Sequence, residues 1–306
     1  MVRTFLALML ACTMAATDAD PSRDLQLVRS RLVALIAPAA PPDAKAAQAV
    51  AEQRADGTWA SVDYADTQRS AWRTSQHLGR HCRVLAERLH AGPDPAAAEA
   101  LRRGLDAWFR LDPRNSNWWH NEIGVPMALG DILLLAGDAV DAERRAKACA
   151  IMRRSVHTRW TGQNLVWGVG IQIARGCIEG DTEAVASGFE RFFREVRIGV
   201  PPWEGVQVDW SFHQHGNVLY AGGYGQGFAC DGARLVNVAA GTRFAAPPAV
   251  VDVLVGYLLD GQRWMIRGDH WDWGAVGREL VRAGKDARWL ASASRLEVAL
   301  IELLRE

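Results

Sequence analysis

The side chains of this sequence that could act on a substrate are concentrated in four short segments rich in polar and aromatic residues. These segments are 115–126 (NSNWWHNEIGVP), 161–164 (TGQN), 209–225, which holds two histidines and Tyr224, and 267–273 (RGDHWDW). Each comes just before a stretch with helical periodicity, and functional side chains concentrate on such loops. Because all four precede helices, we expect them to meet at one end of a helical array.

Tryptophan is unusually abundant in this sequence. The chain has 13 Trp against 4 Tyr and 8 Phe. Indole rings pack well in cores, and they also stack on the C–H faces of pyranose rings, so both core packing and sugar binding are open for each of them. Those in polar or glycine-rich surroundings are Trp59, Trp118, Trp119, Trp203, Trp210, Trp271 and Trp273.

Taken one at a time, several candidate side chains have ordinary structural interpretations. Asn164 alone would cap the N-terminus of a helix. His213 or His215 alone would be a histidine whose hydrogen bonds are satisfied inside the fold. Individually, these residues therefore indicate no function.

Two further candidates carry a phenol and guanidinium groups. Arg278 and Arg282 lie on one helix face at i, i+4 spacing, where a solvated or salt-bridged surface is usual. Tyr224 is less ordinary, because glycine on both sides leaves its ring accessible on a backbone that is either mobile or tightly turned.

Apolar residues recur at helical spacing along most of the chain. The pattern predicts helices at 24–36, 71–90, 94–111, 123–136, 139–157, 165–178, 182–196, 225–238, 248–260, 275–283 and 286–304. Gly, Pro, Asn or Asp stands at nearly every junction, and residues 205–209 are a weak candidate for a strand. Helices of this length in antiparallel succession, without a fixed-period repeat, predict one all-α domain, either a toroid of α-hairpins or a bundle.

Composition narrows the classes of protein and partner. Lys plus Arg and Asp plus Glu both number 35, so the net charge is zero and does not suggest a nucleic-acid-binding protein. An anionic polysaccharide would be held by a local basic cleft. The cysteines form no CxxC pair, so we expect buried thiols rather than a zinc site or a disulfide framework. No stretch after the first residues approaches ~20 apolar residues, so we expect no membrane span.

The first residues have the pattern of an export signal over residues 1–19. Arg3 precedes a short apolar run, and small residues continue to Ala19. We therefore expect cleavage near Ala16 or Ala19 and a periplasmic or extracellular domain over residues 20–306. The alternative is a lipoprotein signal, because residues 9–12 (MLAC) form an imperfect lipidation box with Cys12 as the anchor.

Together these segments resemble polysaccharide lyase family 8, the hyaluronate, chondroitin and xanthan lyases. The similarity is collinear over most of residues 22–306, and His215 precedes Tyr224 by nine residues. The matching pieces, in order, are 56–59, 63–66, 77–78, 117–119, 122–126, 161–164, 209–224 and 277–278 with Arg282. Any one piece is weak, whereas the full set in this order and spacing is specific. The resemblance implies an (α/α) toroid, an incomplete barrel of antiparallel helical hairpins.

The resemblance implies cleavage by β-elimination, in which the C5 proton of a uronate is removed and the C4–O glycosidic bond breaks. That proton is barely acidic while the adjacent carboxylate keeps its charge. Asn164, helped by His215, would neutralise the carboxylate and stabilise the enolate. Tyr224 would take the proton and return one to the leaving oxygen. An unperturbed tyrosine has a pKa of ~10, and Arg278 beside it would favour the phenolate.

The other implied roles concern substrate binding. Arg282 would assist Arg278 or bind a sulfate or carboxylate, and Trp118 and Trp119, with Asn117, would grip the sugar. No metal and no cofactor is implied. The chain departs from the family pattern at residues 120–121 (HN) and 271–274 (WDWG), both at the expected cleft, which leaves the identity of the substrate open.

The resemblance also implies large antiparallel β domains after the helical one, which close the cleft and supply an acidic residue to the catalytic network. We expect this chain to carry the helical domain alone, either sufficient by itself or completed by a separate chain. Two alternatives stay open, a truncated non-catalytic polysaccharide-binding remnant and an α/α-toroid glycoside hydrolase. The hydrolase would need two carboxylates about 5–9.5 Å apart, and the candidates are Glu122, Asp131, Asp209 and Asp272.

Overall fold

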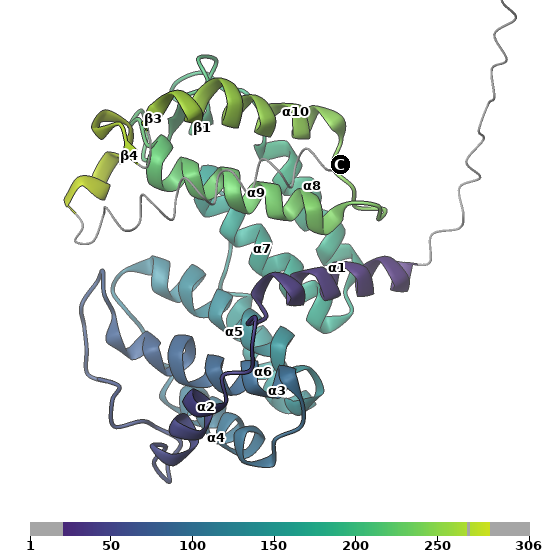
Figure 1. Ribbon diagram of the computed structural model, residues 1–306, viewed down its shortest axis with the longest axis vertical. Helices are drawn as coiled ribbons and strands as arrows, with labels where there is room; N and C mark the ends of the chain where they lie inside the picture. The colour runs from purple at the N-terminus through teal and green to yellow at the C-terminus, as the bar shows by residue number, and fades with distance from the viewer. Residues whose placement is uncertain (1–20, 268–269, 282–306) are drawn as a thin grey trace, which may run out of the picture.

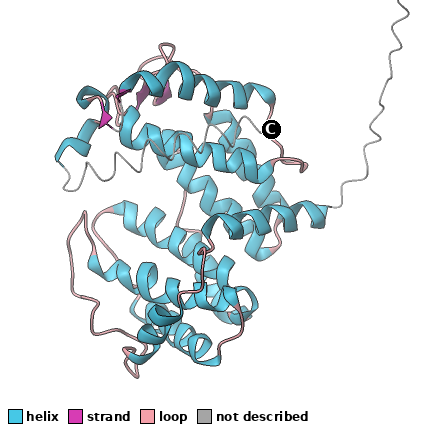
Figure 2. Ribbon diagram, viewed as in Figure 1, coloured by secondary structure: helices cyan, strands magenta, loops and turns pink. Residues whose placement is uncertain are grey.

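The computed structural model describes residues 21–267 and 270–281 (Figure 1). The expected export signal over residues 1–19, the predicted helix at 286–304 and Arg282 lie outside the described residues. Within them the chain is mostly helical, and its named strands are short (Figure 2). The structure confirms the all-α fold class, with helical hairpins arranged as an α/α toroid.

One lobe of the toroid comes from the first half of the chain and forms the lower part of Figure 1. Its helices are α2 (Asp43–Ala51), α3 (Arg83–Ala91), α4 (Pro95–Leu111), α5 (Val125–Ala136) and α6 (Ala142–Met152). They enclose an apolar core in which Trp59, Leu105, Trp108 and Ile132 are fully buried. This core is the base from which segment 115–126 leads into α5.

The other lobe contains most of the second half of the chain. Its helices are α1 (Pro21–Ile36), α7 (Gly162–Glu179), α8 (Thr182–Glu195), α9 (Gln226–Ala239) and α10 (Pro248–Gly256). Phe192 and Phe228 are among its fully buried residues. Helix α7 belongs to both lobes, because Val169 and Ile173 pack in this core and Ile171 packs in the first one.

Aspartate side chains fix the start of several helices. Asp94 accepts a hydrogen bond from the N–H of Ala97 at 3.0 Å at the start of α4. Asp141 and Asp181 do the same for α6 and α8, at 2.9 and 3.0 Å. These N-caps satisfy backbone donors that the first helical turn leaves unpaired, which is why the predicted starts of these helices lie close to the observed ones.

Short irregular elements connect the helices and carry several of the expected functional segments. Turns of π-helix are η2 (His77–Cys82), η3 (His120–Gly124) and η6 (Tyr257–Gly261), while η5 (Ala221–Gly225) is a kink in which Gly222 and Gly223 have non-helical backbone angles. Turns of 3-10 helix are η1 (Arg73–Ser75), η4 (Gly137–Ala139), η7 (Gln262–Met265), η8 (Trp273–Ala275) and η9 (Gly277–Val281). Strands β1 (Gly205–Val206) and β2 (Phe212–His213) pair antiparallel, as do β3 (Ile266–Arg267) and β4 (His270–Trp271). Turns of π-helix, such as η3 at His120, are frequent at functional sites.

The structure corrects some boundaries that periodicity predicted. Helix α2 was not predicted, because prolines break the apolar pattern before it, yet its alanine-rich sequence favours a helix. The predicted helix at 71–90 becomes α-helical only at Arg83. The predicted helix at 139–157 ends at Met152. Of the strand at 205–209, only Gly205–Val206 is formed.

Cys82, Cys149, Cys177 and Cys230 are buried thiols outside any disulfide, as predicted. In the part of the chain that the structure describes, no helix is long and apolar enough to cross a membrane. Nor do those residues include a group of three or more His, Cys, Asp or Glu side chains placed to hold a metal ion.

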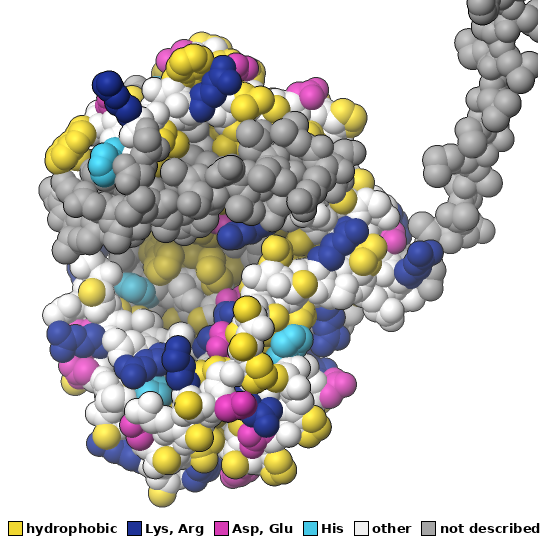
Figure 3. All heavy atoms as spheres, viewed as in Figure 1, with side chains coloured by type: hydrophobic (Ala, Val, Ile, Leu, Met, Phe, Trp, Pro, Cys, Tyr) yellow, Lys and Arg dark blue, Asp and Glu magenta, His cyan; other side chains and the backbone are white. Residues whose placement is uncertain are grey.

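The face shown in Figure 3 is hollowed between the two lobes, and hydrophobic side chains lie in the hollow.

Candidate active site

Tyr224 lies just after a sharp break in the backbone that precedes α9. Gly223 has a φ of +114°, and a Cβ there would come within 2.8 Å of the Tyr220 ring, so the position requires glycine. The Tyr224 ring is edge to face with Tyr220 at 4.9 Å and with His215 at 5.0 Å, and 5.9 Å from Trp167. The tight turn, one of the two backbone states expected for this residue, therefore places the phenol among three other rings.

The imidazole of His215 and the guanidinium of Arg278 are in direct contact. Arg278 Nη2 donates to His215 Nε2 at 2.9 Å. Because a guanidinium can only donate, Nε2 must accept, so the ring is neutral and its proton is on Nδ1. His215 is an exposed residue, and its pKa is lowered by partial desolvation and by the charge of Arg278, while Glu204 opposes both. His215 also has a φ of +60°, a left-handed conformation that is uncommon outside glycine.

Arg278 also lies close to two tyrosines. Its pKa is raised, chiefly by its interaction with Tyr220, and Tyr224 makes a smaller contribution. The Tyr220 hydroxyl donates to Glu279 Oε1 at 3.1 Å. The guanidinium is therefore placed beside the imidazole and both phenols.

Asn164 lies in the first turn of α7, next to a contact with the histidine loop. Thr161, not Asn164, is the N-cap residue of this helix. The backbone N–H of Gln163 donates to Gln214 Oε1 at 3.0 Å, and Gln214 directly precedes His215. The Oδ1 atom of Asn164 is buried and has no hydrogen-bond partner among the described residues. A buried polar atom without a partner calls for an explanation, and a donor on a substrate would provide one.

The paired tryptophans have different environments. Trp118 is 41% exposed, and its ring lies 5.3 Å from that of Trp160. Trp119 is half-buried and edge to face with Trp167 at 5.7 Å. Since Trp167 also contacts Tyr224, a row of aromatic rings joins segment 115–126 to the phenol.

Asn117 holds the loop that carries these tryptophans. Its Nδ2 donates to the carbonyl of Arg69 at 2.9 Å, and its Oδ1 accepts from the N–H of Trp119 at 3.2 Å. His120 Nε2 bonds the same Arg69 carbonyl at 3.1 Å. Both ends of the Asn117 amide are thus engaged with the backbone, and a contact of Asn117 with sugar stays a prediction.

Sequence reasoning did not single out Trp160, Trp167, Tyr220 or Glu204. Trp167 follows Asn164 by three residues on α7, a spacing that puts both on one face of a helix. From that spacing, Trp167 could have been predicted to lie beside Asn164. The other three matter through contacts with residues distant in sequence, for which the sequence alone offers no local pattern.

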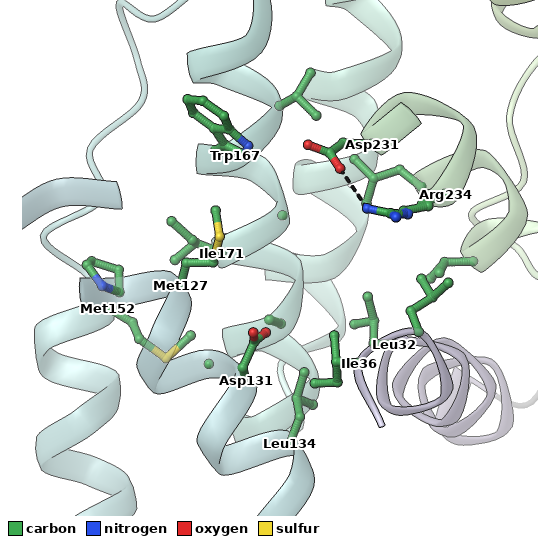
Figure 4. Close-up of a pocket in the computed structure, with 18 residues that line it drawn as sticks. Leu32, Ile36, Met127, Asp131, Leu134, Met152, Trp167, Ile171, Asp231 and Arg234 are labelled. Carbon is green, nitrogen blue, oxygen red and sulfur yellow. Dashed lines mark hydrogen bonds and ion pairs between the residues drawn. The ribbon is translucent and has the colours of Figure 1, made fainter. Parts of the chain in front are cut away.

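Trp167 also lines a cavity of about 370 Å³ between α1, α5, α7 and α9 (Figure 4). Its walls are mainly aliphatic, and its polar members are Asp131, Asp231 and Arg234. Asp231 accepts from Gln163 Nε2 at 2.7 Å and pairs with Arg234 at 3.1 Å. A hydrogen bond therefore links Asp231 in the wall of the cavity to Gln163 in the first turn of α7, beside the candidate active site.

Three of the four carboxylates considered for a glycoside hydrolase have local structural roles. Asp131 pairs with Arg83 at 2.6 Å. Asp209 and Asp272 accept hydrogen bonds from the backbone of their own turns at 3.0 and 2.7 Å. Burial raises the pKa of Glu122. These four are not among the partners of Tyr224 described above.

The fold and this cluster define an α/α-toroid protein in which a tyrosine, a histidine and an arginine lie together, beside the first turn of α7 that carries an asparagine. The model of the N-terminal alpha-helical domain of polysaccharide lyase family 8 matches residues 30–303. The chain belongs to this family, which confirms the resemblance seen in the sequence.

Individual relatives match the chain over different lengths. Chondroitinase-AC of Pedobacter heparinus is 27% identical over 234 residues, which cover 74% of this chain and 33% of that protein. Xanthan lyase of a Bacillus species is 28% identical over 187 residues, 55% of this chain and 18% of that protein. The chain thus spans about a third or less of the length of these curated relatives.

Solved structures share the fold. A chondroitinase AC lyase determined as enzyme–oligosaccharide complexes has a TM-score of 0.78 at 22% identity, covering 92% of this chain and 44% of that one. The chondroitin AC lyase of Streptomyces coelicolor in complex with chondroitin sulphate has a TM-score of 0.77 at 22% identity, covering 92% of this chain and 42% of that one.

Proposed function

We propose that this chain carries the β-elimination centre of a uronate-polysaccharide lyase. The observation that supports the proposal most directly is the cluster in which Arg278 donates to His215 at 2.9 Å while the His215 ring lies edge to face with that of Tyr224 at 5.0 Å. A base, a cation that stabilises it and a neutral hydrogen-bond donor come together from distant parts of the chain. Elimination needs such groups within reach of one sugar ring.

In this proposal His215 and Asn164 neutralise the uronate carboxylate. Arg278 occupies Nε2 of His215, so Nδ1–H is the donor left for a carboxylate oxygen. The amide of Asn164 can donate through its NH2 group, and its unpartnered oxygen can accept from a sugar hydroxyl. Hydrogen bonds placed where charge develops lower the barrier most in a partly desolvated site.

Tyr224 is the proposed base and acid. Its phenolate takes the C5 proton, the electron pair of the C5–H bond forms the C4–C5 double bond, and the C4–O bond breaks. The phenol then gives its proton to the leaving oxygen, which restores the phenolate. Arg278, which contacts His215 next to the phenol, is proposed to stabilise that phenolate during the reaction, and Arg282 is proposed to assist it or to bind an anionic substituent.

Substrate class and location follow from the relatives and from the N-terminal sequence. Relatives are named chondroitinase, xanthan lyase and hyaluronate lyase, so uronate polymers of these kinds are the proposed substrates. Trp118 and Trp119 are proposed to stack on the sugar. Residues 1–19 are proposed to direct export of a lyase domain formed by residues 20–306.

The test is to offer the purified chain hyaluronan, chondroitin, xanthan and alginate while following the ultraviolet absorbance of the new double bond. Absorbance with one polymer, lost in Tyr224→Phe, supports the proposal. New reducing ends without absorbance would favour a glycoside hydrolase. Binding without any cleavage of the four polymers contradicts the lyase proposal for this chain and favours a polysaccharide-binding role.

A further inference from the structure

One carboxylate, that of Glu204, connects the start of α7 with the histidine loop. Glu204 is partly buried in the loop between α8 and β1. Its Oε2 accepts from Thr161 Oγ1 at 2.7 Å and from Gln214 Nε2. Its Oε1 accepts from the N–H of Gly216 at 2.9 Å. Thr161 is the N-cap residue of α7 and Gly216 directly follows His215, so the carboxylate bridges two segments of the candidate active site.

Backbone donors fix the direction of the hydrogen bonds in this group. The N–H of Gln163 can only donate, and it donates to Gln214 Oε1 at 3.0 Å. The NH2 group of Gln214 must then point at Glu204. The N–H of Gly216 can likewise only donate. Both oxygens of Glu204 must therefore accept, which a carboxylate can do and an amide of the same shape cannot.

The same hydrogen bonds hold an unusual backbone. His215 and Gly216 have φ values of +60° and +77°, both in the left-handed region. The bond from Gly216 to Glu204 stabilises this turn. On the other segment, Gly162 has a φ of +54°, and a Cβ there would come within 2.2 Å of Gln214 Oε1. The two segments thus approach as closely as glycine permits.

We propose that Glu204 is a positioning residue that sets the distance and orientation between the amide of Asn164 and the imidazole of His215, and that this role requires a carboxylate. The proposal rests on the elimination function proposed above, in which both groups act on one substrate carboxylate. Glu204 exerts its effect through the residues that it holds. Its charge also favours a protonated His215, against the effect of Arg278.

Glu204→Gln is the decisive variant, and Glu195→Gln is its matched control. Glu195 accepts the N–H of Gly162 at 2.5 Å at the same end of α7, a hydrogen bond that the carbonyl oxygen of glutamine can also accept. On a polymer that the wild type cleaves, we expect Glu204→Gln to lower kcat about 100-fold, because misplacing catalytic groups by about 1 Å has an effect of this size. We expect KM to change less, because the neutralising groups act mainly on the transition state. Glu195→Gln should stay close to the wild type.

Nitrogen NMR of the His215 ring gives a readout that does not depend on turnover, and His215→Gln assigns its signals. The wild type and Glu195→Gln should show one neutral tautomer with the proton on Nδ1, and Glu204→Gln should show a shifted signal or a mixture of tautomers. If the wild type makes no unsaturated product, the elimination proposal fails, and the NMR comparison still tests Glu204. A Glu204→Gln variant with wild-type kcat and a wild-type His215 signal overturns the positioning role.

Folding of each variant is checked by circular dichroism. If Glu204→Gln does not fold, Thr161→Val replaces it, since this change removes one of the hydrogen bonds to Glu204 and leaves the others. The expected loss of kcat is then smaller and in the same direction. Wild-type kcat and an unchanged His215 signal in Thr161→Val would count against the proposal.

Discussion

The guanidinium of Arg278 donates to Nε2 of His215 at 2.9 Å, and this contact determines the protonation state of the histidine. An imidazolium in the same place would bring two positive charges together and would have no lone pair to accept the N–H. The histidine is therefore a neutral donor through Nδ1. This state is the one that the proposed elimination requires of a group that hydrogen-bonds the uronate carboxylate.

Replacing the cation should raise the pKa of His215. That pKa is lowered by partial desolvation and by the charge of Arg278, so Arg278→Ala removes the second cause and leaves the first. A titration of the ring followed by NMR measures the change. Arg263→Ala is the control, because Arg263 stacks on the exposed Trp264. The same His215 pKa in Arg278→Ala and the wild type would show that the charge has no influence there.

Removing the phenol of Tyr224 should abolish most of the elimination. Tyr224→Phe keeps the ring contacts with Tyr220 and His215 but has no group to carry the proton. We expect kcat to fall by about 10²- to 10⁴-fold, with the melting temperature nearly unchanged. The rate of absorbance increase from unsaturated product is the measurement. Tyr220→Phe should lose less activity, and a larger loss there than in Tyr224→Phe would assign the base to Tyr220.

The amide of Asn164 should matter for rate more than for fold. Its oxygen has no partner among the described residues, so Asn164→Ala removes little that stabilises the protein. We expect kcat to fall about 10²- to 10³-fold, the usual effect of removing one donor that stabilises a developing anion. Asn164→Asp should in addition raise KM, because it places a negative charge beside the substrate carboxylate. Steady-state kinetics on the same polymer measure kcat and KM for both variants. A wild-type kcat in Asn164→Ala would show that this residue takes no part in the mechanism.

Truncating Trp118 should weaken substrate binding. Its ring is 41% exposed beside Trp160, where it is available for stacking. An aromatic contact is worth about 0.5–1.5 kcal/mol, so Trp118→Ala should raise KM roughly 2- to 13-fold and leave kcat nearly constant. Trp264→Ala, at a position that is 73% exposed on η7, is the matched control. Equal KM values in the two variants would argue against a sugar platform at Trp118.

A buried histidine far from the expected chemistry should make stability depend on pH. His77 is fully buried between the hydroxyl of Tyr64 and the carbonyl of Gly104, both at 2.8 Å. Burial lowers its pKa from 6.5 to about 4, and the hydrogen bond with Gly104 opposes this shift.

As the pH falls from 6.5 toward 4, the unfolded chain binds a proton at His77 and the folded chain does not, so the folded state loses stability over this range. The loss from this residue is roughly 3 kcal/mol. Urea unfolding at a series of pH values measures the slope. His77→Gln should reduce the slope, and an identical slope would show that His77 is not its source.

The sequence predicted the helices best where their ends follow general rules. Asp94, Asp141 and Asp181 cap helices that were placed within three residues of their observed starts. Helix α2 was not predicted because prolines interrupt the apolar pattern just before it, although its alanines favour a helix. The π-turn that holds His120 and the backbone kink that precedes Tyr224 were not predicted, since their geometry depends on packing rather than on periodicity.

The candidate site was predicted in part. The family pattern pointed to His215, Tyr224 and Arg278, which the structure brings into contact. It did not point to Glu204 or Trp167, whose importance lies in hydrogen bonds and ring contacts between segments distant in sequence. No local pattern of apolar and polar residues encodes such contacts.

Helix α7 contributes to the cores of both lobes, while its first turns carry Asn164 and Trp167. The position of this helix therefore sets the distance between segment 115–126 on one lobe and the phenol of Tyr224 on the other. A small rotation of this helix about its own axis would change the gap available to a sugar ring. If the proposed function holds, substitutions deep in either core, with no contact to the substrate, would change which polymer fits.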